Sequence, residues 1–156
     1  MQTPFELRAA TESDAQWIAE LRAVVLKNDL ERLDRYDPVR VRQRFLNEFR
    51  PEHTKIITLD GLAAGSLALR PTSDSQWLEH FYIDPQHQGK GLGGSVLADL
   101  MRRHADTRPF RLNVLAGSPA QRLYLRHGFV VDTSDPIDVF MVARGLTPRR
   151  PVTPTC

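Results

Sequence analysis

Residues Gln86–Gly94, "QHQGKGLGG", contain four of the nine glycines of the chain within six consecutive positions. The segment lies between an aromatic run typical of a strand, "WLEHFYIDP" (77–85), and a run with helical spacing, "SVLADLMRRHADT" (95–107). Glycine is costly here, because it loses more backbone entropy on folding than any other residue. So dense a cluster indicates that something must approach this backbone closely.

A strand that leads into a glycine-rich turn and then a helix is typical of an anion site. The N–H groups at the start of a helix converge on one point, and the helix dipole favours negative charge there. Glycine lets those N–H groups reach phosphate oxygens without a Cβ in the way. The segment therefore predicts a ligand that carries phosphate.

Two common phosphate sites agree poorly with the segment. A P-loop needs a lysine followed directly by Ser or Thr, whereas Lys90 is followed by Gly91. Gly89, Gly91 and Gly94 match the letters of the dinucleotide motif G-x-G-x-x-G. That motif, however, follows the first strand of its fold and has an acidic residue about twenty positions later. Several strands are expected before Gly89, and the next strand, "RLNVLA" (111–116), ends without an acid. A nicotinamide-dependent oxidoreductase is therefore a disfavoured alternative.

Local signals predict the other elements. Thr11 and Asp14 form a capping-box variant that predicts the start of a first helix, and Pro38 predicts the first turn of a second. The dipeptide Asp60-Gly61 predicts a hairpin, because both residues tolerate positive φ. Ser118 and Gly128 predict the two ends of a last helix. The expected fold is a mixed α/β sheet of about seven strands and four helices, in which antiparallel hairpins flank a parallel centre.

Size and composition are those of an ordinary soluble protein with one core. The chain has 156 residues, 41% hydrophobic and 26% charged, with a net charge of +2. These values and the single cysteine, Cys156, predict a cytoplasmic protein without a nucleic-acid or membrane partner. We expect one domain over residues 1–146 and a flexible, Pro/Arg-rich tail over residues 147–156.

Two motifs on these elements resemble the GNAT superfamily of N-acetyltransferases. Residues Gln86–Gly91 match each fixed position of its acetyl-CoA loop, Gln/Arg-x-x-Gly-x-Gly/Ala, at the start of a helix after the fourth strand. Tyr124 precedes Gly128-Phe129 by the spacing that the family shows at its next helix, with Ala120 one turn earlier. The predicted element order agrees from about residue 5 to residue 144. Gly117 departs from the family, because many members carry an asparagine there.

The resemblance implies that the chain uses acetyl-CoA as its acyl donor. The backbone amides of residues 88–94 would bind the CoA pyrophosphate, and the strand near Phe81 would pair with the pantetheine arm. Lys90 is expected on the solvent side, as a charge near the phosphates. The implied cofactor-binding residues are Phe81, Tyr82, Ile83, Gln88, Gly89, Lys90, Gly91, Leu92, Gly93 and Gly94.

The resemblance also implies the catalytic groups. Tyr124 resembles the general acid of the family, which protonates the departing thiolate; the alternative is a tyrosine that only packs beside its helix. Glu79 is the preferred general base, with His80, a water chain or an ordinary surface carboxylate as alternatives. Strand alternation places Glu79 and His80 on opposite faces, so only one of them is expected to face the acceptor.

The acceptor itself is expected to be a primary amine of a small molecule or peptide. The segment "LKNDLERLDRYDPVR" (26–40), near the expected acceptor cleft, balances acids and bases and selects no amine class. Its acids, and the arginines Arg40, Arg42 and Arg44, are better explained as solvated helix faces than as ligand sites. The five histidines show no metal spacing, so no metal is predicted. A catalytically silent acyl-CoA sensor is the alternative function, and the protein is expected to be a monomer or homodimer.

Overall fold

A computed structural model describes residues 4–147, which form one seven-stranded sheet in the order β1-β2-β3-β4-β5-β7-β6. The strands are β1 (Glu6–Ala9), β2 (Thr54–Leu59), β3 (Leu62–Pro71), β4 (Gln76–Ile83), β5 (Phe110–Leu115), β6 (Val130–Ser134) and β7 (Asp138–Ala143). The α-helices in this range are α1 (Ala15–Arg32), α2 (Pro38–Glu48), α3 (Leu92–Arg103) and α4 (Ala120–Arg126). Only β4 and β5 pair in parallel within this sheet, which confirms the predicted fold class.

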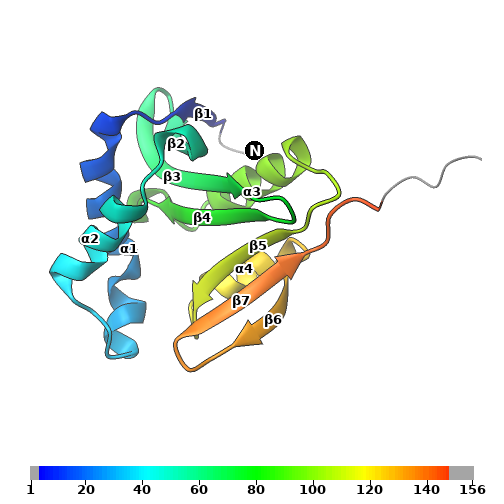
Figure 1. Ribbon diagram of the computed structural model, residues 1–156. Helices are drawn as coiled ribbons and strands as arrows, with labels where there is room; N and C mark the ends of the chain where they lie inside the picture. Colours follow the sequence, from blue (N-terminus) through cyan, green and yellow to red (C-terminus); the bar gives the residue numbers. More distant parts are fainter. Residues whose placement is uncertain (1–3, 148–156) are drawn as a thin grey trace, which may run out of the picture.

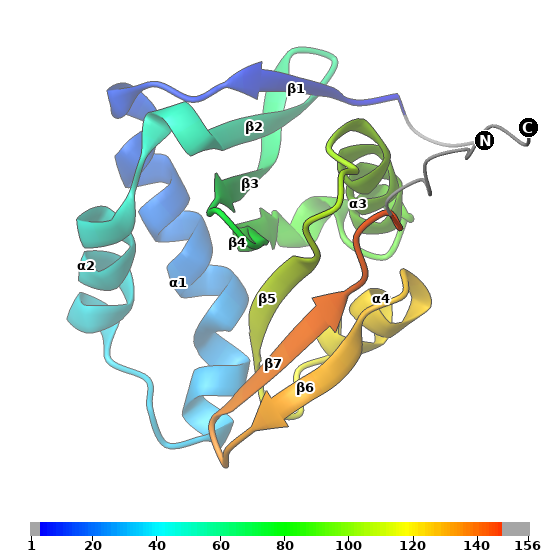
Figure 2. The same cartoon turned by 45° about the vertical axis from the view of Figure 1, so that its right-hand side comes forward.

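The helices cover both faces of the sheet, and each face has its own apolar core. Figures 1 and 2 show α1 and α2 on one side and α3 and α4 on the other. Phe45 of α2 is fully buried on the first side, against Ile18 of α1 and Ile56 of β2. Val96 and Leu97 of α3 are fully buried on the second side. The sheet is thus the middle layer, and a gap within it would connect the two faces.

The local sequence signals form as predicted. Asp14 accepts a hydrogen bond from the Thr11 amide at 2.8 Å, and a short 3-10 turn (Glu12–Asp14) leads into α1. Asp60 and Gly61 adopt φ of 50° and 79° in the β2–β3 hairpin. Gly128 follows α4 with φ of 88°. Each of these signals depends only on neighbouring residues, which is why the sequence revealed them.

The parallel pair β4–β5 opens after three residues. Gln76, Trp77 and Leu78 of β4 face Phe110, Arg111 and Leu112 of β5. Beyond Leu78, β4 stays paired with β3 to its end, while β5 stays paired with β7. Backbone groups on this edge of β4 therefore lose their ladder partners, and such groups need other partners. The fold thus leaves a polar opening between two neighbouring strands.

A β-bulge in β4 overturns the predicted alternation of its side chains. Glu79 pairs with Ala68 and Tyr82 with Ser66, so His80 and Phe81 together oppose one residue of β3. His80 adopts φ of 50°, and its carbonyl accepts a hydrogen bond from the Ser66 hydroxyl at 3.0 Å. Because a bulge adds one residue, it changes which face the following side chains occupy.

The consequence of the bulge is that Glu79 and His80 lie on the same face. The His80 ring meets Phe45 of α2 edge-on at 5.0 Å, and Tyr82 belongs to the core beneath α1. Leu78, Phe81 and Ile83 pack on the opposite side, toward α3 and α4. The prediction that only one of Glu79 and His80 could face the acceptor cleft was therefore wrong.

Two further predictions concern a membrane-spanning helix and the C-terminal tail. None of the helices within residues 4–147 combines the length and the apolar character needed to cross a membrane. Of the predicted tail, 147–156, all but Thr147 lies outside the described residues, and so does Cys156.

Candidate functional site

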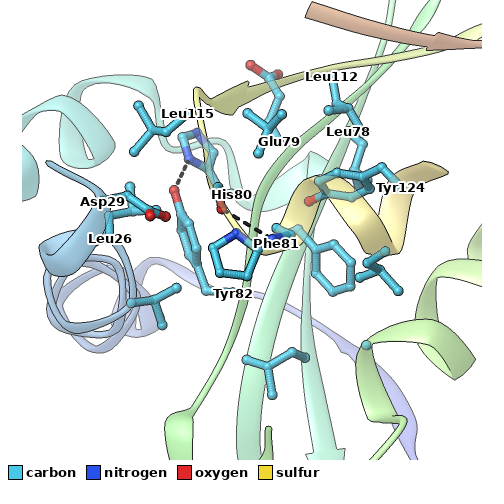
Figure 3. A pocket seen from close by; sticks show the side chains of 18 of the residues that line it. Leu26, Asp29, Leu78, Glu79, His80, Phe81, Tyr82, Leu112, Leu115 and Tyr124 are labelled. Carbon is cyan, nitrogen blue, oxygen red and sulfur yellow. Dashed lines mark hydrogen bonds between the residues drawn. The ribbon is translucent and has the colours of Figure 1, made fainter. Parts of the chain in front are cut away.

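The opening between β4 and β5 is part of a cleft of about 870 Å³. Its walls come from α1, α2, β4, β5, α4, β7 and the glycine loop, so it reaches both faces of the sheet. The predicted site residues that line it are Glu79, Phe81, Tyr82, Ile83, Gln88, Gly89, Gly91, Leu92, Gly93, Gly94 and Tyr124. Lys90 is exposed and lies outside this lining. Figure 3 shows side chains of β4 and of α4 converging on the cleft.

The glycine loop is held against the end of β4 by its own side chains. Asp84 accepts a hydrogen bond from the Gln86 amide at 3.0 Å. Gln88 Nε2 donates to the Ile83 carbonyl at 2.8 Å. Gly89 and Gly91 have φ of 78° and 81°, and Gly91 is the N-cap of α3. Only glycine adopts this left-handed conformation without strain, so it directs the loop into the helix.

The amides of this loop are largely unused within the described residues. Gln88 N–H donates to the Pro85 carbonyl at 3.3 Å, and Ser95 N–H donates to the Gly91 carbonyl at 3.0 Å. The amides of residues 89–94 between them find no acceptor in the part of the chain that the structure describes. Unpaired N–H groups at a helix start attract an anion. The amides of residues 89–94 are therefore available to an anion, whereas that of Gln88, the first in the predicted range 88–94, is already used.

Tyr124 lies at the middle of the cleft, on α4. Its ring is buried and meets Phe129 edge-on at 5.8 Å, which fixes its direction. The hydroxyl points into the cleft and has no hydrogen-bond partner within residues 4–147 (Figure 3). Burial, and to a smaller extent the neighbouring Tyr82, raises the pKa of Tyr124 above its ordinary value. The side chain is therefore a protonated donor at neutral pH.

The turn before α4 explains the departure at Gly117. This residue has φ of 76°, a conformation that glycine and asparagine adopt most easily among the common residues. Ser118 Oγ accepts a hydrogen bond from the Ala120 amide at 3.2 Å, although α4 begins one residue later than predicted, with Pro119 rather than Ser118 as its N-cap. The helix start is thus capped without asparagine, and Tyr124 keeps its position on the following turn.

Three titratable side chains meet at the β4 bulge. His80 Nε2 lies 3.4 Å from Glu48 Oε2, and ligand atoms of Glu48, Glu79 and His80 all lie within 4.8 Å of one another. Glu79 Oε1 also accepts from Arg70 Nε at 2.6 Å. The cleft therefore has a carboxylate-rich end on the face of α1 and α2, across the sheet opening from the glycine loop.

His80 is uncharged at neutral pH. Burial, helped by the nearby Arg22 guanidinium, lowers the pKa of His80 from 6.5 to about 4. Glu48 favours the charged form, but 59% of its side chain is exposed, so water screens its field. The desolvation of the imidazole therefore decides its charge.

Residues 50–131 match the family model described as an acetyltransferase (GNAT) domain. The chain belongs to the GNAT acetyltransferase family. The family performs acyl-CoA-dependent acetyl transfer, and the mostly antiparallel sheet differs from the doubly wound sheet of nicotinamide-binding folds. A comparison with curated proteins gives no match.

Solved structures share this fold at low sequence identity. PaiA N-acetyltransferase from Thermoplasma acidophilum, solved in complex with coenzyme A, has a TM-score of 0.71 and 17% identity, covering 90% of this chain and 99% of that one. An acetyltransferase from Thermus thermophilus has a TM-score of 0.70 and 18% identity, over 94% and 100%. N-acetylglutamate synthase from Neisseria gonorrhoeae, complexed with coenzyme A and N-acetyl-glutamate, has a TM-score of 0.67 and 17% identity, over 94% and 36%.

The GNAT chain should lose stability in acid through His80. The unfolded state binds a proton near pH 6.5, whereas the folded state binds it only near pH 4. Stability is therefore complete above pH 6.5 and falls as the pH drops toward 4, by about 3 kcal/mol for this shift. Chemical denaturation at pH 7 and pH 4.5 measures this change in the free energy of unfolding. His80→Asn should remove this part of the loss, and His104→Asn, at an exposed helix end, should not. Equal acid loss in both variants would contradict it.

Sequence reasoning missed two charged groups of the GNAT cleft. Glu48 ends α2, and Arg22 lies in the middle of α1, where its NH1 approaches Tyr82 Oη at 3.3 Å. Neither residue belongs to a motif, and each reaches the cleft only because its helix packs across the sheet. The amphipathic pattern of a helix predicts which side is buried but not what a polar residue at its border will touch.

Most acids of the segment 26–40 make structural contacts. Asp29 pairs with Arg32 at 2.9 Å, and Glu31 with Lys27 at 3.8 Å. Asp37 caps α2 by accepting from two backbone amides. Glu31 and Asp37 are exposed and agree with the solvated interpretation, whereas Asp29, with only 15% of its side chain exposed, lines the cleft beside its ion pair with Arg32 (Figure 3).

The group Glu48, Glu79 and His80 could also offer ligands to a cation. It provides one ring nitrogen and two carboxylates, but Arg70 already neutralises Glu79. Divalent ions at catalytic sites usually take three uncommitted protein ligands. These three residues form the carboxylate-rich end of the cleft, which is called the acceptor end because the function proposed below would place the acceptor there.

Proposed function

We propose that the chain is an N-acetyltransferase that moves an acetyl group from acetyl-CoA directly to a primary amine of a small molecule or peptide. The supporting observation is the order of groups along the β4–β5 opening. Free amides of the glycine loop lie at one end, the Tyr124 hydroxyl in the middle, and Glu79 with His80 at the other. This is the order in which pyrophosphate, thioester sulfur and attacking amine must be held.

The donor, a co-substrate consumed in each turnover, would bind along this opening. Amides of residues 89–94 would hold its pyrophosphate, with Lys90 as an added charge on the solvent side. Gln88 would act through its side chain, because it fixes the end of β4. Asp84 N–H donates to Ala64 of β3, so by alternation Ile83 directs its own N–H and C=O toward the opening.

The pantetheine arm would lie along the Phe81–Ile83 edge of β4. Tyr82 would support this edge indirectly, because its side chain is buried beneath α1. The free N–H groups of the edge are suited to hydrogen-bond the thioester carbonyl as negative charge develops on its oxygen.

The reaction would proceed by direct transfer. A base, Glu79 or His80, takes a proton from the acceptor ammonium, and the neutral nitrogen attacks the thioester carbon. The C–N bond forms, the C–S bond breaks, and Tyr124 gives its proton to the departing sulfur. The attached nitrogen then loses its second proton, which restores Tyr124, and the base releases the first proton to solvent. The products are therefore an amide, free CoA and one proton, and no further reactant is needed.

Calorimetric titration with acetyl-CoA, CoA and NADH tests the donor site. We expect acetyl-CoA and CoA to bind. NADH should not bind, because the sheet lacks the doubly wound topology in which nicotinamide sites occur. Release of thiol in the presence of amines would then establish transfer. Binding of acetyl-CoA without thiol release to any amine would favour the silent acyl-CoA sensor, and binding of NADH alone would contradict the proposal.

Two charge-reversal variants, compared in the same titration, test whether the donor phosphates bind at the glycine loop. Lys90→Glu should weaken acetyl-CoA and CoA equally, and more at low salt, because it places a negative charge beside the loop amides. Lys55→Glu makes the same change of net charge on an exposed position of β2, outside the cleft. If both variants weaken binding to the same extent, the loop does not hold the phosphates.

A further inference from the structure

Arg22 is a half-buried cation with no carboxylate partner in the described residues. Its NH1 lies 3.3 Å from Tyr82 Oη and 3.5 Å from His80 Nδ1, which are both uncharged groups. Its Nε is buried and has no hydrogen-bond partner. Within residues 4–147, no ion pair includes Arg22.

A half-buried arginine without an ion pair is energetically unfavourable for the protein when no ligand is bound. A guanidinium removed from water loses hydration, and only a charged or well-placed acceptor restores that loss. The arginines Arg42, Arg70 and Arg108 each have a carboxylate within 2.7 Å. Arg22 lines the cleft instead. A ligand that carries negative charge would complete its contacts.

A second cleft, of about 630 Å³, continues this positive region. Its lining contains Arg22, Arg35, Arg40 and Arg44 but only two acids, Asp135 and Asp138. Asp135 is already engaged, because its Oδ1 accepts from the amides of Ile137 and Asp138 at 2.8 and 2.7 Å. The two clefts share lining residues Arg22, Leu30, Arg44, Leu115 and Asp138, so the positive region borders the acceptor end directly.

The two signs of charge meet at His80. Arg22 approaches Nδ1 of the ring, whereas Glu48 approaches Nε2 at 3.4 Å. A carboxylate-rich side suited to an ammonium group and a guanidinium side suited to an anion are thus separated by one imidazole. A compact molecule with both charges would satisfy both sides, whereas a simple alkylamine would leave Arg22 unpaired.

We propose that the acceptor is a small amine that also carries an anionic group, a carboxylate or a phosphate, bound by Arg22. This inference rests on the proposed N-acetyl transfer and adds its substrate class. Arg44, exposed at the junction of the two clefts, is a second contact for the same anion. Guanidinium groups bind both oxyanions through paired hydrogen bonds, so the experiment must distinguish them.

Matched acceptors test the inference through thiol release from acetyl-CoA. The common amino acids are compared with their α-amides, and phosphoethanolamine with ethanolamine. For the better anion, we expect kcat/KM to exceed that of its neutral match by about 10- to 100-fold, the range of a charged hydrogen bond. Preference for the acids or for phosphoethanolamine identifies the anion. Equal use of charged and neutral amines would overturn the inference while N-acetyl transfer itself stands.

The variant Arg22→Gln should bring that ratio close to one. The ratio is decisive because any change that Arg22 causes through His80 affects the charged and neutral acceptors alike. Arg22→Lys should restore part of the preference, and Arg102→Gln, on the exposed face of α3, should leave it unchanged. Arg44→Gln gives a second test on an exposed residue if Arg22→Gln does not fold.

The remaining outcomes are also decisive. An unchanged ratio in both Arg22→Gln and Arg44→Gln would overturn the inference. So would acetyl-CoA binding with no anionic amine accepted. Failure to bind acetyl-CoA at all, measured by calorimetry in the same samples, would instead overturn the proposed function together with the inference that rests on it.

Discussion

Replacement of Tyr124 by phenylalanine should lower kcat by about 100-fold or more, the usual contribution of a positioned acid, with the affinity for acetyl-CoA unchanged. The hydroxyl points into the cleft and has no protein partner in residues 4–147, so its removal breaks no internal hydrogen bond. Removal of a hydroxyl that faces the cleft without a protein partner should change stability little. Lost turnover would therefore reflect lost proton donation, because fold and donor binding remain.

The control for this prediction is Tyr36→Phe. Tyr36 lies between α1 and α2 with Lys27 Nζ 5.8 Å from its ring centre, and it lines neither cleft. The same atom is removed in both variants, so only the position differs. Rates and calorimetric affinities should be measured together. Unchanged turnover in Tyr124→Phe would show that the tyrosine only packs beside its helix.

The raised pKa of Tyr124 defines what kind of acid it is. Burial holds the proton on the hydroxyl throughout the neutral range, so the wild-type rate should not fall through ionisation of this group at moderately alkaline pH. The proton is therefore released only as negative charge develops on the sulfur. Such a donor acts late in the reaction, as the C–S bond breaks.

The glycine loop and Tyr124 could be predicted because each depends on residues that are close in sequence. Positive φ at Gly89 and Gly91 follows from the needs of a turn that enters a helix, whereas Tyr124 is identified by the resemblance to the family, in which a tyrosine keeps this spacing to a glycine such as Gly128. The same is true of the Asp60-Gly61 hairpin. Short-range geometry is encoded in short-range sequence, and so these elements needed no knowledge of the packing.

Glu79 and His80 were predicted as candidates, but their place on one face could not be, because it depends on the register between β3 and β4. The bulge at His80 is stabilised by Ser66, which donates to the His80 carbonyl from the neighbouring strand. Nothing near His80 in the sequence signals this hydrogen bond. A one-residue change of register moves a side chain to the other face. Arg22 and Glu48 reach the site across the sheet for the same reason, through helix packing.

The identity of the base has the second large expected effect. Glu79→Gln should lower kcat/KM about 100-fold near pH 7, the lower range for general-base catalysis. His80→Asn should lower it less, because the uncharged imidazole attracts the acceptor ammonium less than the Glu79 carboxylate does, and a pKa lowered to about 4 gives His80 no advantage as a base. Both variants are designed to keep the fold. Glutamine retains an oxygen for Arg70 Nε, and asparagine tolerates the φ of 50° at the bulge.

The dependence of each variant on pH separates loss of the base from other damage. A missing base matters only while the acceptor is an ammonium ion, so the rate of Glu79→Gln should recover as the pH rises toward the acceptor's own pKa, about 8 for an α-amine. A structural defect would persist at every pH. Glu52→Gln, on the exposed 3-10 turn before β2, supplies the matched control outside both clefts. A larger, pH-recoverable loss in His80→Asn would assign the base to His80, and no such loss in either variant would remove both residues, leaving the proton to water.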